Sequence, residues 1–331
     1  MSSASSAGLP AGLASPPPPV PDTLVSFPAP HVLLVTLNRP KQLNCIPRPQ
    51  HFALERLWDW YDDESTLRCA VITGTGRAFC AGADLKEWNA INTRSDAAAP
   101  AAEPAATTNS PSGAPSQAAI TATGANNTPR QQQQQQQPDD RPTSRMPRGG
   151  FGGMSNRGGA KPILAAANGL CFGGGMEMAI NCDMVIASAS ARFSLPEVTI
   201  GVIALAGALP RLVRSVGRQR ASEMAMSGKQ YTAAEMREWG LVNEIVPAEA
   251  GSDGVVEKAL EWARRIAGNS PDAVIVSREG LKLGWEGVGP EMGTDMLIKG
   301  WYGRIEKGEN MVEGVRSFNE KRKPVWKDSK L

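Results

Sequence analysis

Histidine is nearly absent from this sequence, and its scarcity limits the chemistry that the chain can perform. The 331 residues contain only His31 and His51, both near the start. A Ser-His-Asp or Cys-His nucleophilic site would need one of them, and neither lies near a turn that would present a nucleophile. We therefore do not expect catalysis by histidine.

Paired cysteines, net charge and long apolar runs are also lacking. The five cysteines form no CxxC pair and are odd in number, which favours free thiols over a disulfide framework, and we predict no metal site. The formal net charge of +2 gives no electrostatic reason to expect a nucleic-acid partner. No apolar run is long enough to span a bilayer, so we expect no membrane insertion. The hydrophobic content of 41% is sufficient for a packed core.

Composition divides the chain into segments. Residues 1–23 are rich in Ser, Ala and Pro and are predicted to form a disordered leader. Residues 91–149 include seven consecutive glutamines and few core-forming side chains, so we predict a low-complexity disordered insertion. The glycine-rich stretch 150–162 that follows is interpreted as a linker leading back into the core. The predicted core covers 24–90 and 150–250, and a helical region covers 251–328.

Apolar patterns predict an α/β core followed by helices. Continuous apolar runs predict strands over 31–37, 69–74, 163–169 and 183–190. An amphipathic helix over 50–62 separates the first two strands, which suggests a parallel crossover. Further helices are predicted near 207–215, 219–227, 255–268, 271–284, 290–300 and 310–322.

The stretch CFGGGMEMAIN, residues 171–181, places three glycines before a predicted helix whose first turn contains Glu177. It has neither the GxGxxG nor the GxxxxGK[ST] spacing, so a phosphate-binding loop is weakly supported. Glycines would expose backbone N–H groups at the helix start, which suits a developing oxyanion such as a thioester carbonyl becoming an enolate. Tight packing between strand and helix explains the glycines equally well.

Two acidic motifs add to this picture. In GRAFCAGADLKEW, residues 76–88, Asp84 follows small residues and is predicted to cap a short helix, an ordinary turn being the simpler interpretation. Glu177 and Glu197 each have a structural explanation at a helix or turn start. Facing one another in apolar surroundings, they would instead take a proton from water and deliver one to carbon. Their spacing in the sequence does not show whether they meet.

Several segments, in this order, resemble the enoyl-CoA hydratase/isomerase (crotonase) superfamily: NRPKQLN, GTGRAFCAGADLKEW, KPILAAANGLCFGGGMEMAINCDMVIAS, ARFSLPEVTIG and GLVNEIVP. The resemblance covers about residues 24–90 and 150–327. It implies a spiral of repeated ββα units with a C-terminal helical trimerisation region, assembled as a homotrimer or hexamer. It also implies an acyl-CoA substrate and no separate cofactor, because coenzyme A is part of the substrate.

The resemblance assigns roles to particular residues. The backbone N–H groups of Ala83 and Gly174 would polarise the thioester carbonyl. Glu177 would orient and deprotonate the water that attacks the β-carbon, and Glu197 would exchange the proton at the α-carbon. The segment that lines the coenzyme A site would consist of Ala83, Asp84, Leu85 and Lys86. Two retained glutamates favour hydration or its reverse, dehydration.

The strongest resemblance is to fungal peroxisomal members that serve β-oxidation or the synthesis of acyl groups for siderophores or toxins. The last residues, Ser329, Lys330 and Leu331, spell the peroxisomal address SKL, which would be bound by an import receptor. A chance tripeptide on a lysine-rich tail is the alternative. Leu205 stands where hydratases commonly have glycine, which leaves the acyl-chain preference open. Alternative functions are a Δ3-Δ2-enoyl-CoA isomerase or, in another class, an RNA-binding or scaffolding pseudoenzyme.

Overall fold

The computed structural model describes residues 12–85, 87 and 146–331 of the chain. The chain divides into two units, and all of these residues except Glu87 belong to the one made of residues 1–85 and 145–331. The predicted insertion lies mostly outside the described residues, as does Lys86.

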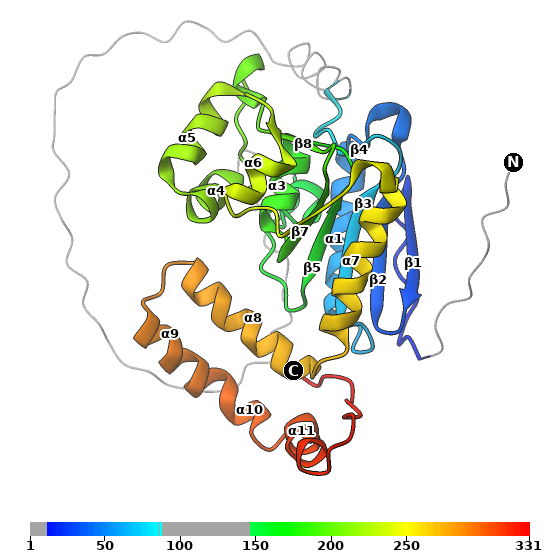
Figure 1. The fold of residues 1–331 in the computed structure, drawn as a ribbon, viewed down its shortest axis with the longest axis vertical. Coiled ribbons are helices and arrows are strands. Elements are labelled where there is room, and N and C mark those ends of the chain that lie inside the picture. Colours follow the sequence, from blue (N-terminus) through cyan, green and yellow to red (C-terminus); the bar gives the residue numbers. More distant parts are fainter. Residues whose placement is uncertain (1–11, 86, 88–145) are drawn as a thin grey trace, which may run out of the picture. The chain divides into compact units, whose positions relative to one another are not determined.

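Two sheets form the centre of the described unit (Figure 1). The larger has six strands in the order β1-β2-β3-β5-β7-β10 and is parallel except for the antiparallel pair β1 and β2. Its strands are β1 (Thr23–Ala29), β2 (Val32–Leu37), β3 (Cys69–Gly74), β5 (Ile163–Ala167), β7 (Met184–Ser188) and β10 (Glu244–Val246). The smaller sheet contains β4 (Ala78–Cys80), β6 (Leu170–Phe172), β8 (Arg192–Ser194) and β9 (Tyr231–Thr232), in that order.

The strands follow a repeating plan. Each of β3, β5 and β7 in the large sheet is followed by a short strand, β4, β6 or β8, in the small sheet. Helix α3 (Gly174–Asn181) follows β6, and the turn η3 (Glu197–Ile200) follows β8. The predicted α/β architecture of repeated ββα units is thus confirmed, and so is the parallel crossover from β2 through α1 (Arg48–Asp63) to β3.

The remaining helices lie mainly in the second half of the chain. They are α4 (Ala208–Val216), α5 (Arg218–Ser227), α6 (Ala233–Glu238), α7 (Gly251–Ala267), α8 (Pro271–Trp285), α9 (Pro290–Leu297), α10 (Gly303–Ile305) and α11 (Glu309–Asn319), with short turns η1 (Pro40–Gln42), η2 (Phe151–Gly153), η4 (Ala248–Ala250) and a π-helical turn η5 (Ile298–Tyr302). The predicted C-terminal helical region is confirmed.

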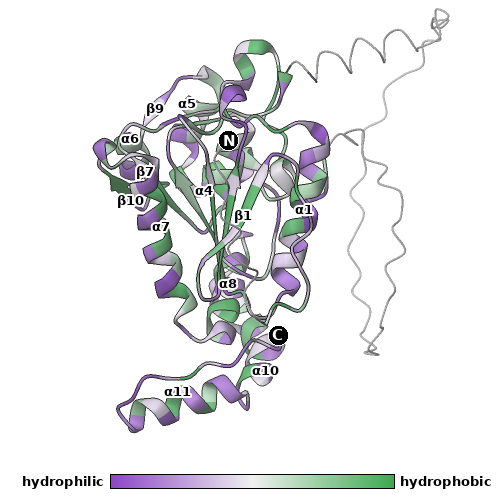
Figure 2. Cartoon of the chain, turned by 90° about the vertical axis from the view of Figure 1, so that its right-hand side faces the viewer, coloured by the Kyte–Doolittle hydropathy of each residue, from purple (hydrophilic) through white to green (hydrophobic). Residues whose placement is uncertain are grey.

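The large sheet is covered on both faces. Along β3, Ile72 belongs to a core cluster with α1 and α3, whereas Val71 belongs to a second cluster with α7. Successive side chains of a strand point to opposite faces, so a strand covered on both sides needs an unbroken apolar run. Figure 1 shows α7 lying across the strands, and the alternation of green and purple along α7 in Figure 2 marks its apolar and polar sides.

The structure differs from the sequence prediction at the leader. Within the predicted disordered segment 1–23, the backbone N–H of Ala14 donates to the Glu64 carboxylate over 2.8 Å, and Val20 is buried. These residues therefore pack on the core, and β1, which was not predicted, begins at Thr23. The proline-rich composition did not reveal these partners: Gln50 and Trp60 of α1 donate to leader carbonyls, and Glu64, the residue after α1, accepts.

Candidate active site

Each of the three glycines at the start of α3 is required by a close neighbour. A Cβ atom on Gly173, where φ is +55°, would lie 3.2 Å from Oε1 of Glu197. One on Gly174 would lie 2.3 Å from the Phe151 ring, and one on Gly175 only 2.1 Å from the Cys80 carbonyl oxygen. Tight packing therefore explains the glycines, and the same packing brings Glu197 to the N-terminus of the helix that carries Glu177.

The loop that carries Ala83 closely approaches the start of this helix at Gly82. A Cβ atom on Gly82, where φ is +98°, would be 3.4 Å from the nitrogen of Gly174. The loop is held there because Ile46 N–H donates to the Gly82 carbonyl over 3.0 Å. Within the described part of the chain, neither Ala83 N–H nor Gly174 N–H donates to a protein acceptor. The packing and oxyanion explanations of the glycines are thus compatible, since the close approach leaves two donors available.

Glu177 is buried in the first turn of α3, with an exposed fraction of 3%. Its Oε1 accepts hydrogen bonds from Ala206 N–H at 3.0 Å and Ala208 N–H at 3.5 Å. Burial, and then the charge of Glu197, raise the pKa of Glu177 to about 7, although these two bonds and the Arg211 cation oppose the rise. The side chain therefore exchanges a proton close to neutral pH.

Glu197 enters the same region from η3. Its Oε2 is buried without a hydrogen-bond partner among the described residues, and burial raises the pKa of its carboxyl group, opposed by its own backbone N–H. A carboxyl oxygen without a donor favours the protonated form. The structure therefore brings together the two glutamates whose meeting the sequence left open.

The residues predicted to line the coenzyme A site are only partly described. Asp84 is held by Arg39, whose Nη2 donates to it over 3.0 Å, while Nη1 of Arg39 donates to the Cys45 carbonyl. Leu85 is half-exposed. Lys86 lies outside the described residues.

The loop that leads into α4 holds the unusual Leu205. Its side chain is 71% exposed, whereas the flanking Ala204 and Ala206 are buried. The bulk of Leu205 therefore points away from the buried carboxylate of Glu177 in this chain.

The structure differs from the sequence prediction at residues 147–156, which are predicted as the end of the insertion and the start of a linker. This segment is packed: Gly149 N–H donates to Glu55, and Gly152 N–H donates to Nδ1 of His51 at 3.0 Å. Burial lowers the pKa of His51 to about 4, so the ring is neutral and accepts this bond. The glycine-rich composition hid the segment, because its acceptors are supplied by α1. His51 has a structural task here, in keeping with the prediction against histidine catalysis.

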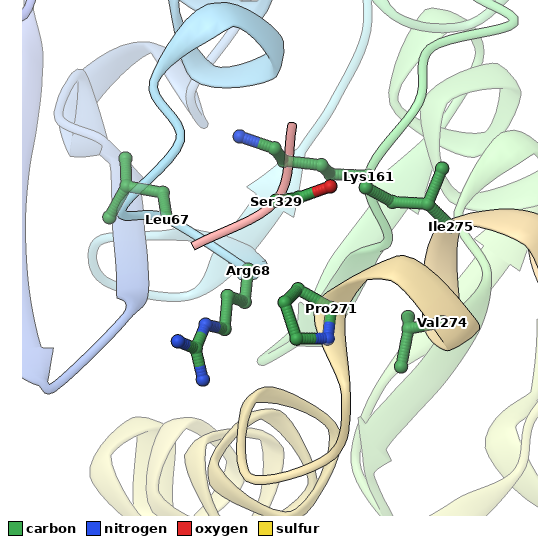
Figure 3. Close-up of a pocket in the computed structure, with 7 residues that line it drawn as sticks. All are labelled: Leu67, Arg68, Lys161, Pro271, Val274, Ile275 and Ser329. Atoms are coloured by element: carbon green, nitrogen blue, oxygen red, sulfur yellow. The ribbon is translucent and has the colours of Figure 1, made fainter. Parts of the chain in front are cut away.

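The C-terminal tripeptide lies against the helical region. Ser329 Oγ donates to Asp272 at 2.6 Å, and Lys330 forms an ion pair with Glu309. Figure 3 shows Ser329 beside Lys161 at a small cavity that Arg68 and Pro271 also line. A group of three His, Cys, Asp or Glu side chains placed to hold a metal ion is not found in the described residues. None of the described helices is long and apolar enough to cross a membrane.

Comparison with known proteins identifies the class. A family model described as "Enoyl-CoA hydratase/isomerase" matches residues 154–329, and a second with the same description matches 32–106. The chain belongs to the enoyl-CoA hydratase/isomerase family, and it is an enzyme of the hydro-lyase kind. The two matched ranges together include the site. The first contains Gly174, Glu177 and Glu197, and the second contains Ala83.

Particular relatives narrow the class further. The chain is 57% identical over 315 residues to "Mevalonyl-coenzyme A hydratase SIDH" of Beauveria bassiana, covering 95% of this chain and 98% of the relative. It is 44% identical over 314 residues to the Aspergillus fumigatus protein of the same description, with the same coverage of both chains. Among solved structures, enoyl-CoA hydratase from Bacillus anthracis matches with a TM-score of 0.72 at 29% identity, covering 93% of this chain and 100% of that chain. The superfamily and fold expected from the resemblance are confirmed.

The raised pKa of Glu177 predicts a pH-dependent stability. The folded chain holds this proton up to about pH 7, whereas an ordinary glutamate loses it near 4.5. The native state therefore binds more protons between these values, and stability falls as pH rises through that window. Because glutamine does not titrate, we expect Glu177→Gln to remove this loss. The free energy of unfolding of the variant minus that of the wild type should therefore increase by about 3 kcal/mol between pH 4.5 and pH 7.5. Urea unfolding of both proteins at several pH values measures it, and a difference that stays constant with pH contradicts the assignment.

Proposed function

We propose that this enzyme adds water reversibly to a 2-enoyl-CoA, giving a 3-hydroxyacyl-CoA, and that its substrate is the branched mevalonyl-CoA or the enoyl thioester formed by its dehydration. The observation that carries the proposal is the meeting of the buried Glu177 and the partly buried Glu197 near two available backbone N–H groups. The branched substrate is supported by the two fungal relatives, which are described as mevalonyl-CoA hydratases and match along almost their whole length.

The proposed chemistry divides the proton transfers between the carboxylates. Ala83 N–H and Gly174 N–H donate to the thioester oxygen and stabilise its negative charge as the enolate forms. During hydration, Glu177 takes a proton from water while the water oxygen bonds to the β-carbon, and Glu197 delivers a proton to the α-carbon. Dehydration reverses both steps, so that Glu197 removes the α-proton and Glu177 protonates the leaving hydroxyl. Asp84 and Leu85 line the coenzyme A part of the site in this proposal.

The environment of each carboxylate suits its proposed role. A pKa of about 7 lets Glu177 act as base in one direction and acid in the other near neutral pH. The partnerless oxygen of Glu197 favours a held proton, ready for transfer to carbon. Isomerisation moves a proton between two carbons and needs no water, so a second carboxylate close to the first favours hydration.

A panel of thioesters tests the proposal. We expect purified enzyme to hydrate the dehydrated form of mevalonyl-CoA with a higher kcat/KM than the straight-chain crotonyl-CoA. In water labelled with oxygen-18, the product should carry the label at its 3-hydroxyl group. A 3-enoyl-CoA converted without label would instead establish the isomerase, and a preference for straight chains would overturn the branched substrate.

Glutamine variants connect the activity to the site. Glu177→Gln and Glu197→Gln should each lower kcat by roughly 10²–10⁴-fold, since each removes one proton transfer. The matched control is Glu249→Gln, the same change at an exposed residue of η4, which should retain full activity. Normal turnover in either site variant would exclude the two-carboxylate mechanism.

We also propose that the C-terminal helices assemble the enzyme as a homotrimer, with pairing of trimers as a further step. Large apolar side chains on these helices are exposed in the single chain: Leu281, Met292, Ile298, Val312 and Phe318, the last by 84%. Figure 2 shows green, hydrophobic bands along α11. Apolar surface gathered on one region is typical of a surface that another chain covers.

Sedimentation velocity tests this assembly. We expect a mass three times that of the 35.1 kDa chain, or six times if trimers pair. Phe318→Glu should produce smaller species, because it places a charge in the proposed interface. Leu24→Glu, the equivalent change at a half-exposed residue of β1, should leave the mass unaltered. A wild-type enzyme that sediments as a single chain would refute the proposal.

Finally, we propose that Ser329, Lys330 and Leu331 direct the enzyme to the peroxisome. The import receptor would compete with Asp272 for Ser329, since that serine is already hydrogen-bonded. A fluorescent protein fused to the N-terminus should accumulate in peroxisomes, and deletion of the three residues should leave it in the cytosol. Adding one alanine after Leu331 is the matched control, because it keeps the tripeptide but removes its terminal position. Peroxisomal import of the deleted form would disprove the address.

A further inference from the structure

A buried serine links the segment after the insertion to the loop that binds Glu177. Ser155 is fully buried, and its Oγ donates to the Ala206 carbonyl over 2.6 Å while accepting from Phe151 N–H over 2.7 Å. The N–H of the same Ala206 donates to Glu177 over 3.0 Å. The carbonyl and the N–H group of Ala206 thus connect the Ser155 hydroxyl to the Glu177 carboxylate.

The next residue holds the cation that faces the same carboxylate. Oδ1 of Asn156 accepts from Nη1 of Arg211 at 2.9 Å, and that nitrogen also donates to the Gly207 carbonyl. A Cβ atom on Gly207 would lie 2.8 Å from the Ser155 carbonyl oxygen and 2.7 Å from Arg211 Nη1. The serine and asparagine therefore lie directly against the loop and the start of α4.

Rigid elements fix this pair of residues in turn. Nε1 of Trp58 on α1 donates to the Gly152 carbonyl at 3.0 Å, and Gly152 N–H donates to His51 of the same helix. Nδ2 of Asn181, at the end of α3, donates to the Met154 carbonyl at 2.6 Å. Because α3 also carries Glu177, the same helix positions both this segment and the Glu177 carboxylate.

We infer that Ser155 and Asn156 are positioning residues that control the protonation of Glu177, the serine by orienting Ala206 N–H and the asparagine by orienting the Arg211 guanidinium. The inference rests on the role of Glu177 in the proposed function. Neither residue touches the reacting atoms; each acts on a donor or a cation that faces the carboxylate.

The charges around Glu177 give the direction of the effect. Glu197 of η3 faces it and disfavours the ionised form, whereas Ala206 N–H, Ala208 N–H and Arg211 of α4 favour it. Misplacing a donor or the cation leaves burial and Glu197 less opposed, so the pKa of Glu177 rises further. In the hydration direction Glu177 must be ionised, and the acidic limb of the pH–rate profile therefore moves to higher pH.

Alanine variants test the inference through two measurements. Ser155→Ala and Asn156→Ala should each move the acidic limb of kcat/KM for hydration upward by about one pH unit and lower kcat at pH 7 several-fold, with a smaller change in KM. The pH range over which deprotonation of Glu177 lowers the free energy of unfolding should move upward by the same amount as the acidic limb. This second measurement needs no turnover, so it still reports on the inference if the proposed function fails. In a Glu177→Gln background, neither substitution should alter the pH dependence of stability.

Matched variants separate positioning from general destabilisation. Ser188→Ala removes another buried serine, on β7, and should leave the pH profile unchanged. Asn156 is exposed, so its variant should fold even if Ser155→Ala does not. Asn156→Gln keeps a neutral amide acceptor for Arg211 and should restore the profile. Lower activity with an unshifted acidic limb and an unshifted stability window in Asn156→Ala and Ser155→Ala would overturn the inference.

Discussion

The site depends on keeping the Glu177 carboxylate in an apolar interior next to a second acidic group. Water would solvate both groups and remove the difference between them, whereas burial makes each sensitive to the few donors within reach. For Glu177 these are the N–H groups of Ala206 and Ala208. Glu197 has no donor at its buried Oε2 among the described residues. Two residues of the same type thus lie in different electrostatic environments within one site.

The different environments of Glu177 and Glu197 result from close backbone packing at the start of α3. Gly173, Gly174 and Gly175 are each pressed against a different group: a carboxylate, an aromatic ring and a carbonyl. The same approach brings Gly82 beside the Gly174 nitrogen and leaves two N–H donors without a protein acceptor in the described chain. The tight packing of these glycines and the availability of the two donors are consequently two results of one arrangement.

Helix α1 contributes to the site without supplying a group that reacts. His51 and Trp58 fix the segment around Gly152, and that segment reaches Ala206 through Ser155. The neutral His51 ring serves as an acceptor for a backbone N–H. The hydrogen bonds that reach Glu177 therefore depend in part on the packing of this segment against α1.

The sequence by itself determined β2, β3, β5 and β7 of the large sheet, the principal helices and the residue types of the site. Continuous apolar runs such as CAVITG can only be buried on both faces, and the order of the motifs carried the family. It did not determine β1, the short strands, the packed part of the leader or the Ser155 segment, because their hydrogen-bond partners are distant in sequence and their composition resembles that of loops. Whether Glu177 and Glu197 meet was likewise decided only by the tertiary structure: they lie on different repeats, and the mutual desolvation that sets their protonation exists only once those repeats pack together.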